Sequence, residues 1–292
     1  MKAISRLFVG PILAAALVGG VAAQEKAPAV KPPRVLVITR EFVKPGKAGT
    51  AHEKTESAFV QAMARAKWPT HYLAVQSMSG KPRALFFTQY DSYEAWENDV
   101  KATDKNTTLS AALDRAYEAD GGLLDSIDQN VFTYNEELSL HPLSDISHMR
   151  LLEIWVAHVR PGHDKEWMDL NKMYRSVYEK AVPTGHWAVY EAAYGPSNGT
   201  YIFLTARKTA SELDRGPQED KAVEAAFGEE GMKKLDELFA AAVDSSETQL
   251  FSFSPAMSYP PDEWVKADPD FWKPKPAAAP AAKTEKKPAA KP

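Results

Sequence analysis

The chain has 292 residues, of which 44% are hydrophobic and 25% are charged, and its formal net charge is −4. These values exclude a largely disordered protein and a bundle of membrane helices, and they fit one large or two small globular domains. The absence of cysteine excludes disulfide bonds, thiolate metal sites, a lipid anchor on cysteine and thioether attachment of haem.

The first 23 residues have the pattern of a secretory signal peptide. Lys2 and Arg6 precede an apolar run that ends in small residues. The run is shorter than the roughly 20 residues that a membrane-spanning helix needs, and it contains Pro11. We therefore expect a secreted or periplasmic protein that begins at Gln24. An uncleaved membrane anchor is the alternative.

The next segment begins with a strand, a turn and a helix. The apolar run from Val35 to Val43 predicts a strand, Pro45-Gly46 predicts a turn, and a stripe with helical spacing follows. The same order returns with the run from Leu151 to Val159 and with Pro161-Gly162. The two helical stripes consist of Ala51, Ala58, Phe59, Ala62 and Met63 in the first copy and of Trp167, Leu170, Met173, Tyr174, Val177 and Tyr178 in the second.

The rest of each copy also repeats. Both helices end near a proline and return to a strand in "PTHYLAVQ" and "PTGHWAVYE", and the β-rich runs "ALFFTQY" and "YIFLTAR" come next. Each copy closes with an aromatic alternation, "VFTYNEELS" or "LFSFSPAMS". Before it, a second helix is predicted to carry Leu123, Leu124 and Ile127 in the first copy and Leu235, Leu238, Phe239 and Val243 in the second.

The order β-α-β-β-α-β, found twice, is that of the ferredoxin-like unit. We expect an α+β protein in which the two repeats pack sheet to sheet as an internal pseudo-dimeric barrel. From residue 34 to about 257 the chain resembles the dimeric α+β barrel superfamily, which includes families like the antibiotic-biosynthesis monooxygenases, NIPSNAP and EthD. The resemblance rests on the element order and on the V-x-P-G turn. It implies that the chain is related to proteins that oxidise aromatic substrates without metal or flavin, and to others that bind haem through a histidine.

These patterns divide the chain into seven segments. They are a signal peptide at 1–23, a linker at 24–33, repeat 1 at 34–140, a linker at 141–148, repeat 2 at 149–257, a C-terminal extension at 258–272 and a Lys/Pro/Ala tail at 273–292.

Charge is distributed unevenly along these segments. The signal, the first linker and the tail carry +2, +1 and +5, so removing them from the formal −4 leaves −12 for the body. Because nucleic acids bind basic surfaces, we expect no nucleic-acid partner, and we expect no stable membrane insertion. The composition of the tail is typical of a disordered segment. We expect the tail to be a spacer or to contact an anionic envelope surface.

Two histidines occupy matching positions at the start of the second strand of each repeat. His71 precedes Tyr72, and His186 precedes Trp187. Two interpretations stay open. Each ring packs at a strand end with its nitrogens bonded to backbone or water, or each lines a pocket as an acid, a base or a ligand, because histidine titrates near neutrality.

Two carboxylates stand inside apolar strands of repeat 2. Alternation places Glu153 on the face of Trp155, and it places Glu191 opposite Tyr190. We expect both carboxylates to pair with arginine or with tyrosine hydroxyls, and catalysis is the alternative. The predicted ligand-binding residues are His186, Trp187, Tyr190, Glu191, Glu153, His71 and Tyr72, with His186 and Glu153 as the candidate catalytic residues.

One pair has metal-ligand spacing. His52 and Glu56 lie four residues apart on one predicted helix face. The second repeat has Met168 and Lys172 at the matching positions, which favours a solvated helix face over a metal site. We therefore predict no metal site and no cofactor, with haem as the alternative. The chain contains no phosphate-binding loop, dinucleotide fingerprint, nucleophile elbow or HExxH motif.

Taken together, the sequence predicts an exported protein that binds a small apolar or aromatic molecule in a barrel pocket. The first alternative is an enzyme, either a cofactor-independent monooxygenase or a haem-binding enzyme. The second is a structural or interaction protein of the cell envelope.

The signal-peptide pattern makes a direct prediction. Cleavage after Ala23 should leave mature protein that begins at Gln24, which N-terminal sequencing of secreted or periplasmic material would detect. Full-length protein that starts at Met1 in the membrane fraction would contradict export.

Overall fold

Each half of the chain has the order strand, helix, two strands, a helical segment and a final strand. The computed structural model describes residues 31–143 and 145–273, so the predicted signal peptide and nearly all of the predicted tail lie outside the described residues. The first half contains β1 (Val35–Val43), α1 (Thr50–Ala66), β2 (Tyr72–Ser77), β3 (Arg83–Tyr90), α2 (Tyr93–Lys105), α3 (Thr107–Gly121) and β4 (Leu124–Leu140). The second half contains β5 (Leu151–Val159), α4 (Asp164–Ala181), β6 (Trp187–Tyr194), β7 (Thr200–Arg207), the 3-10 helix η1 (Ala210–Arg215), α5 (Gly216–Ala242) and β8 (Val243–Phe253). Two short helices follow, α6 (Asp262–Ala267) and α7 (Pro269–Trp272).

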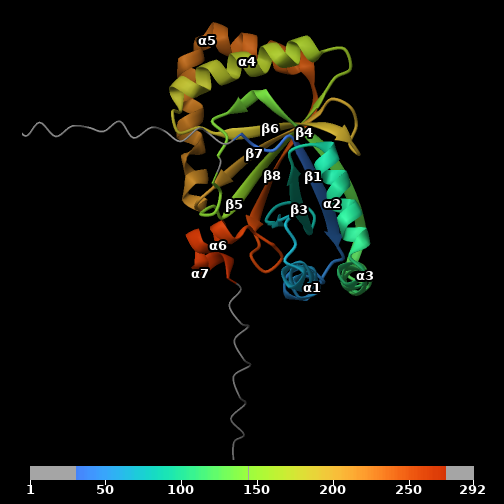
Figure 1. The fold of residues 1–292 in the computed structure, drawn as a ribbon. Helices are drawn as coiled ribbons and strands as arrows, with labels where there is room; N and C mark the ends of the chain where they lie inside the picture. The colour runs from blue at the N-terminus through green and yellow to red at the C-terminus, as the bar shows by residue number, and fades with distance from the viewer. Residues whose placement is uncertain (1–30, 144, 274–292) are drawn as a thin grey trace, which may run out of the picture. The chain divides into compact units, whose positions relative to one another are not determined.

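The eight strands form one antiparallel sheet that closes on itself in the order β1-β3-β2-β8-β5-β7-β6-β4 (Figure 1). Each half contributes four neighbouring strands in the same internal order, β4-β1-β3-β2 and β8-β5-β7-β6. The halves join at two seams, where β2 pairs with β8 and β4 pairs with β6. The edge strands of each half therefore pair with the edge strands of the other half.

The inner face of the sheet holds the largest core. Alternate residues of all eight strands point inward, as the period of two in a strand requires. Buried members of this core from the strands include Leu36, Ile38, Val75, Leu85, Phe87, Phe132, Leu152, Ile154, Tyr190, Ile202, Phe251 and Phe253. Trp272 of α7 packs into the same core, and its indole Nε1 donates to the carbonyl of Ser147 at 2.7 Å. The predicted C-terminal extension thus contributes to the barrel core.

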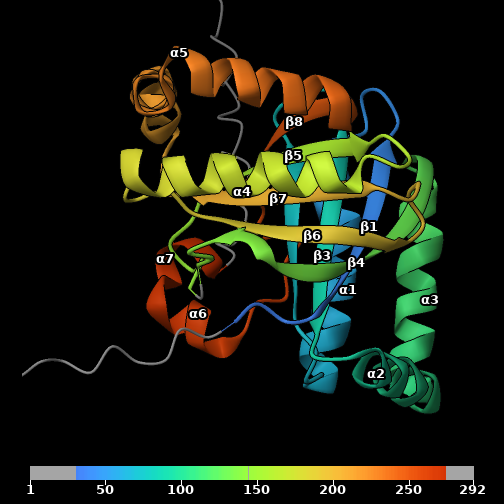
Figure 2. The same ribbon diagram turned by 90° about the horizontal axis from the view of Figure 1, so that it is seen from above.

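Helices cover the outer face. In the first half α1 packs against α3, and in the second half α4 packs against α5 (Figure 2). α5 is bent at Gly228, which has a positive φ of 66°. Among the described residues, no helix is both long and apolar enough to cross a membrane.

Several sequence predictions can be compared with these elements. The strands predicted from Val35 to Val43 and from Leu151 to Val159 are confirmed. The prediction that Leu124 and Ile127 belong to a helix is wrong, because α3 ends at Gly121 and both residues lie in β4. Val243 likewise begins a strand and does not end a helix.

Closure of the sheet predicts that one half is not stable alone. Residues 34–140 would leave the strands β2 and β4 unpaired at their edges and would expose inner-face residues such as Leu36 and Phe132. Open edges and apolar faces of this kind drive association. We expect this fragment to dimerise or precipitate in size-exclusion chromatography with light scattering. A monomer with cooperative unfolding would contradict the prediction.

Candidate ligand-binding site

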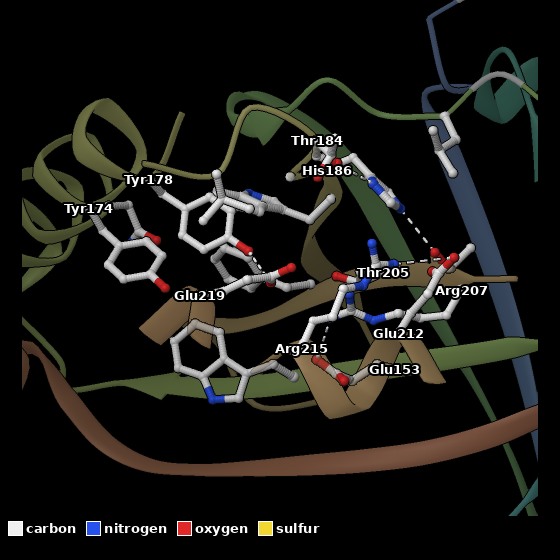
Figure 3. A pocket seen from close by; sticks show the side chains of 18 of the residues that line it. Glu153, Tyr174, Tyr178, Thr184, His186, Thr205, Arg207, Glu212, Arg215 and Glu219 are labelled. Carbon is white, nitrogen blue, oxygen red and sulfur yellow. Dashed lines mark hydrogen bonds and ion pairs between the residues drawn. The ribbon is translucent and has the colours of Figure 1, made fainter. Parts of the chain in front are cut away.

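The second half contains a cavity of about 800 Å³ between the sheet and its helices (Figure 3). Its floor is the outer face of β5, β6 and β7, and its walls come from α4, η1 and α5. Cavities of this size are typical of small-molecule sites.

The floor of the cavity combines aromatic and charged side chains. Glu153 and Trp155 come from β5, and Phe203, Thr205 and Arg207 come from β7. The odd-numbered residues of both strands point outward because the even-numbered neighbours fill the barrel core. The predicted face of Glu153 is therefore confirmed.

The wall formed by α4 depends on residues four positions apart. Leu170, Tyr174 and Tyr178 line the cavity in this spacing, and the rings of the two tyrosines stack with centroids 5.5 Å apart. Gly185 makes room for the second tyrosine, because a Cβ added there would lie 2.2 Å from Cε1 of Tyr178.

Hydrogen-bonding groups inside the cavity are only partly paired. Arg207 Nη2 lies 3.7 Å from the Glu153 carboxylate, and its buried Nε has no partner among the described residues. The Tyr178 hydroxyl donates to Glu219 Oε2 at 3.3 Å. Burial, followed by the nearby Asp220 and Glu219, raises the pKa of Tyr174 to about 12. The Tyr174 phenol therefore stays protonated at neutral pH and can donate a hydrogen bond.

His186 lines the cavity, but backbone carbonyls occupy both of its ring nitrogens. Nδ1 lies 3.1 Å from the oxygen of Thr184, and Nε2 lies 2.9 Å from the oxygen of Ala206. A ligand or an acid/base role at either nitrogen would require one of these contacts to break. The geometry favours the first interpretation of this histidine, a ring that packs at a strand end.

The other predicted residues do not all meet at this cavity. Glu153, His186 and Trp187 line it. Tyr190 and His71 instead line a separate cavity of about 200 Å³ at the barrel interior, where Trp187 and His186 also reach.

Two further predicted residues lie elsewhere. Tyr72 lines the smaller cavity and also packs against Phe86 on the outer side of β2. Glu191 is exposed on β6, directly opposite Tyr201 of β7. Burial, and then the Glu191 carboxylate, raises the pKa of the Tyr201 hydroxyl. The predicted set is thus divided among three places.

The sequence prediction missed several residues that line the larger cavity. They are Tyr174, Tyr178, Thr205, Arg207, Glu212, Arg215 and Glu219. The two tyrosines were assigned to an apolar helix stripe, and their spacing alone does not distinguish a packed stripe from a cavity wall. The expected pairing of Glu153 with an arginine is present, and Arg207 is that arginine.

The prediction that His52 and Glu56 form a solvated helix face is wrong. Both side chains are buried, with exposures of 3% and 2%. α1 turns this face toward β1 and α3, where Glu41 and Asp120 lie. Charged groups from distant parts of the chain therefore surround a pair that looks like a surface pair in the sequence.

No family model and no curated protein matches this sequence. Among solved structures, a candidate monooxygenase from Fusobacterium nucleatum aligns with a TM-score of 0.50 and 12% identity over 77% of this chain and 94% of that chain. A mutant chlorite dismutase from Candidatus Nitrospira defluvii has a TM-score of 0.46 and 8% identity over 80% and 94% of the two chains. A haem-binding protein from Thermus thermophilus has a TM-score of 0.43 and 13% identity over 81% and 95%. The likeness to the first of these shows a shared mixed α+β fold and no function.

The close approach of Gly185 to Tyr178 gives a test of the cavity wall. Gly185→Ala should push the Tyr178 ring out of position and destabilise the protein by about 1–3 kcal/mol, the usual cost of overpacking, in chemical denaturation. Gly216→Ala is the control, because no atom lies within 4 Å of a Cβ added there. Equal stability of Gly185→Ala and wild type would show that the ring is not held in this position.

Proposed function

We propose that the protein binds a small aromatic molecule in the cavity between the sheet and helices α4 and α5. The observation that carries this proposal is the combination of an aromatic floor and wall with a buried, unpartnered arginine donor. Apolar walls with a few polar groups are the usual composition of a small-molecule site. Trp155, Phe203 and Tyr174 supply ring surface on opposite sides of the cavity.

The polar groups define a further property of the ligand. Arg207 Nε is a buried donor without a partner among the described residues, and leaving such a group unsatisfied is costly. The protonated Tyr174 hydroxyl is a second donor. The ligand therefore carries an acceptor, such as a carboxylate, a phenolate oxygen or a carbonyl oxygen.

Haem fits this cavity poorly if His186 is its ligand. Both imidazole nitrogens face backbone carbonyls at 3.1 Å or less, so neither is available to an iron atom without rearrangement.

A cofactor-independent enzyme that acts on the same aromatic ligand is the second candidate. The observation that favours it is the Tyr178–Glu219 hydrogen bond, because a carboxylate inside the cavity can accept a proton from a phenolic substrate. Substrate turnover with molecular oxygen and purified protein would distinguish an enzyme from a binding protein. A structural role in the envelope is the outcome if neither binding nor turnover is found.

Three further proposals concern the whole chain. The shared strand order of the two halves and their reciprocal edge pairing support tandem ferredoxin-like repeats of the dimeric α+β barrel kind. The basic and apolar pattern of the first 23 residues supports export to the periplasm or the medium. The six lysines of the tail support a contact with an anionic envelope surface.

Binding is tested with an anilinonaphthalene sulfonate dye, an aromatic probe with an anionic acceptor, followed by fluorescence titration. Arg207→Gln should weaken binding by roughly 10- to 100-fold, because a hydrogen bond to a charged group contributes about 1.5–3 kcal/mol.

Arg160→Gln is the matched control, since Arg160 pairs with Asp244 at 3.2 Å on the surface of the same half. It should bind the dye like the wild type, and so should His71→Ala. Absence of dye binding, or equal weakening in both arginine variants, would contradict the proposed site. An absorption spectrum with a Soret band in protein from its native compartment would instead support haem.

A further inference from the structure

Four ionisable side chains meet between the sheet and the helices of the first half. Glu41 comes from the outer face of β1, His52 and Glu56 come from α1, and Asp120 comes from the last turn of α3. Each is 4% exposed or less. One potential ligand atom from each residue lies within 4.8 Å of the others.

One imidazole cannot satisfy three carboxyl groups. His52 Nε2 lies 2.9 Å from Glu41 Oε2 and 3.6 Å from Asp120 Oδ1, and that nitrogen carries at most one proton. Thr55 Oγ1 donates to Asp120 Oδ1 at 2.5 Å. Uncompensated carboxylates in a buried site are strongly unfavourable.

Glu56 carries a buried oxygen without a partner. Its Oε1 accepts no hydrogen bond from the described residues. Burial, followed by Glu41 and then Asp120, raises the pKa of Glu56 to about 10. Protonation would remove the charge, but the carboxyl would still have no hydrogen-bond partner at Oε1.

A second buried group without a partner lies within electrostatic range of Glu56. The Tyr72 hydroxyl has no hydrogen-bond partner in the described part of the chain, and burial, followed by Glu56, raises its pKa. Unsatisfied polar groups are rare in native interiors, so the orphaned Glu56 oxygen within the cluster points to a missing ligand.

We propose that Glu41, His52, Glu56 and Asp120 bind one divalent cation of a first-row transition metal, either Zn²⁺ or Mn²⁺. Imidazole nitrogen and carboxylate oxygen are the donors that these ions accept. In a tetrahedral site with metal–ligand distances of about 2.0–2.2 Å, two ligand atoms lie roughly 3.3–3.6 Å apart. The candidate atoms lie within 4.8 Å of one another, so the widest pair closes by about 1 Å when the ion binds.

The proposed ion has a structural role. Four protein ligands without an open position are typical of structural metal sites, and these ligands come from one strand and two helices. The ion would hold α1 and α3 against β1. It would also offset the repulsion among the three carboxylates, of which His52 contacts only Glu41 and Asp120.

The site is confined to the first half. The Pro-Gly turns align Glu41 with Ala157, and they align His52 and Glu56 with Met168 and Lys172. The second half therefore lacks the donors, and it contains the ligand cavity in the corresponding layer. Metal binding can be tested independently of the proposed function.

The test uses full-length protein purified without a metal-affinity tag, stripped with a chelator and titrated with Zn²⁺ or Mn²⁺ alone. We expect one equivalent of ion to remain after desalting and the thermal midpoint to rise, because only the folded chain assembles the ligands. Glu56→Gln should weaken binding by roughly tenfold or more. The metal-free variant should be at least as stable as metal-free wild type, because the amide removes a buried ionisable group.

Glu179→Gln is the matched control, since Glu179 pairs with His141 at 3.0 Å on the surface. This variant should retain as much metal ion after desalting as the wild type. If Glu56→Gln does not fold, X-ray absorption of zinc-loaded wild type decides: one imidazole with carboxylate oxygens supports the site, and any other shell contradicts it. Wild-type protein that retains no ion, or equal retention by Glu56→Gln, would overturn the proposal.

Discussion

Closure of the antiparallel sheet is the constraint on which the rest of the structure depends. Because β2 pairs with β8 and β4 pairs with β6, each described strand of the barrel has a neighbour on both sides. Inner residues then fill a shared apolar core, and outer residues lie under helices. A polar side chain that is buried on the outer face of a strand must therefore find a partner in the layer between sheet and helices. Both the ligand cavity and the buried acidic cluster are located in that layer.

The same layer differs between the two halves. In the first half it is filled by ionisable groups around His52, and in the second half it is hollow and lined by Trp155 and Phe203. Small changes at matching positions account for the difference. Ala157 stands where the first half has Glu41, and it is fully buried in an apolar cluster. Without a carboxylate on the strand, the helix facing it needs no histidine, and this half can hold a cavity. This difference accords with the two proposals, an ion that stabilises the first half and a small molecule that binds in the second.

Local patterns in the sequence predict the strands well and the sites only in part. The apolar runs and the Pro-Gly turns predict the bounds of β1 and β5, because a strand with two largely buried faces reads as a continuous apolar run. The end of α3 was missed, because the leucines after Gly122 continue the apolar stripe of the helix although the glycine pair ends it. The burial of His52 could not be predicted from its own helix. It depends on Glu41 and Asp120, which only the tertiary fold brings beside it.

The groups available in the cavity restrict its chemistry. His186 was the most attractive catalytic candidate in the sequence, but its ring nitrogens are occupied by the backbone of its own strand end and of β7. What remains are phenols held protonated, the Arg207 donor, and carboxylates such as Glu219. Such a set can donate hydrogen bonds to an acceptor and can take up a proton. A second imidazole also lines the cavity, that of His148, whose Nδ1 lies 3.4 Å from Asp268 Oδ2. The base for any reaction in this cavity is therefore a carboxylate or His148, and recognition of a ligand does not require a reaction at all.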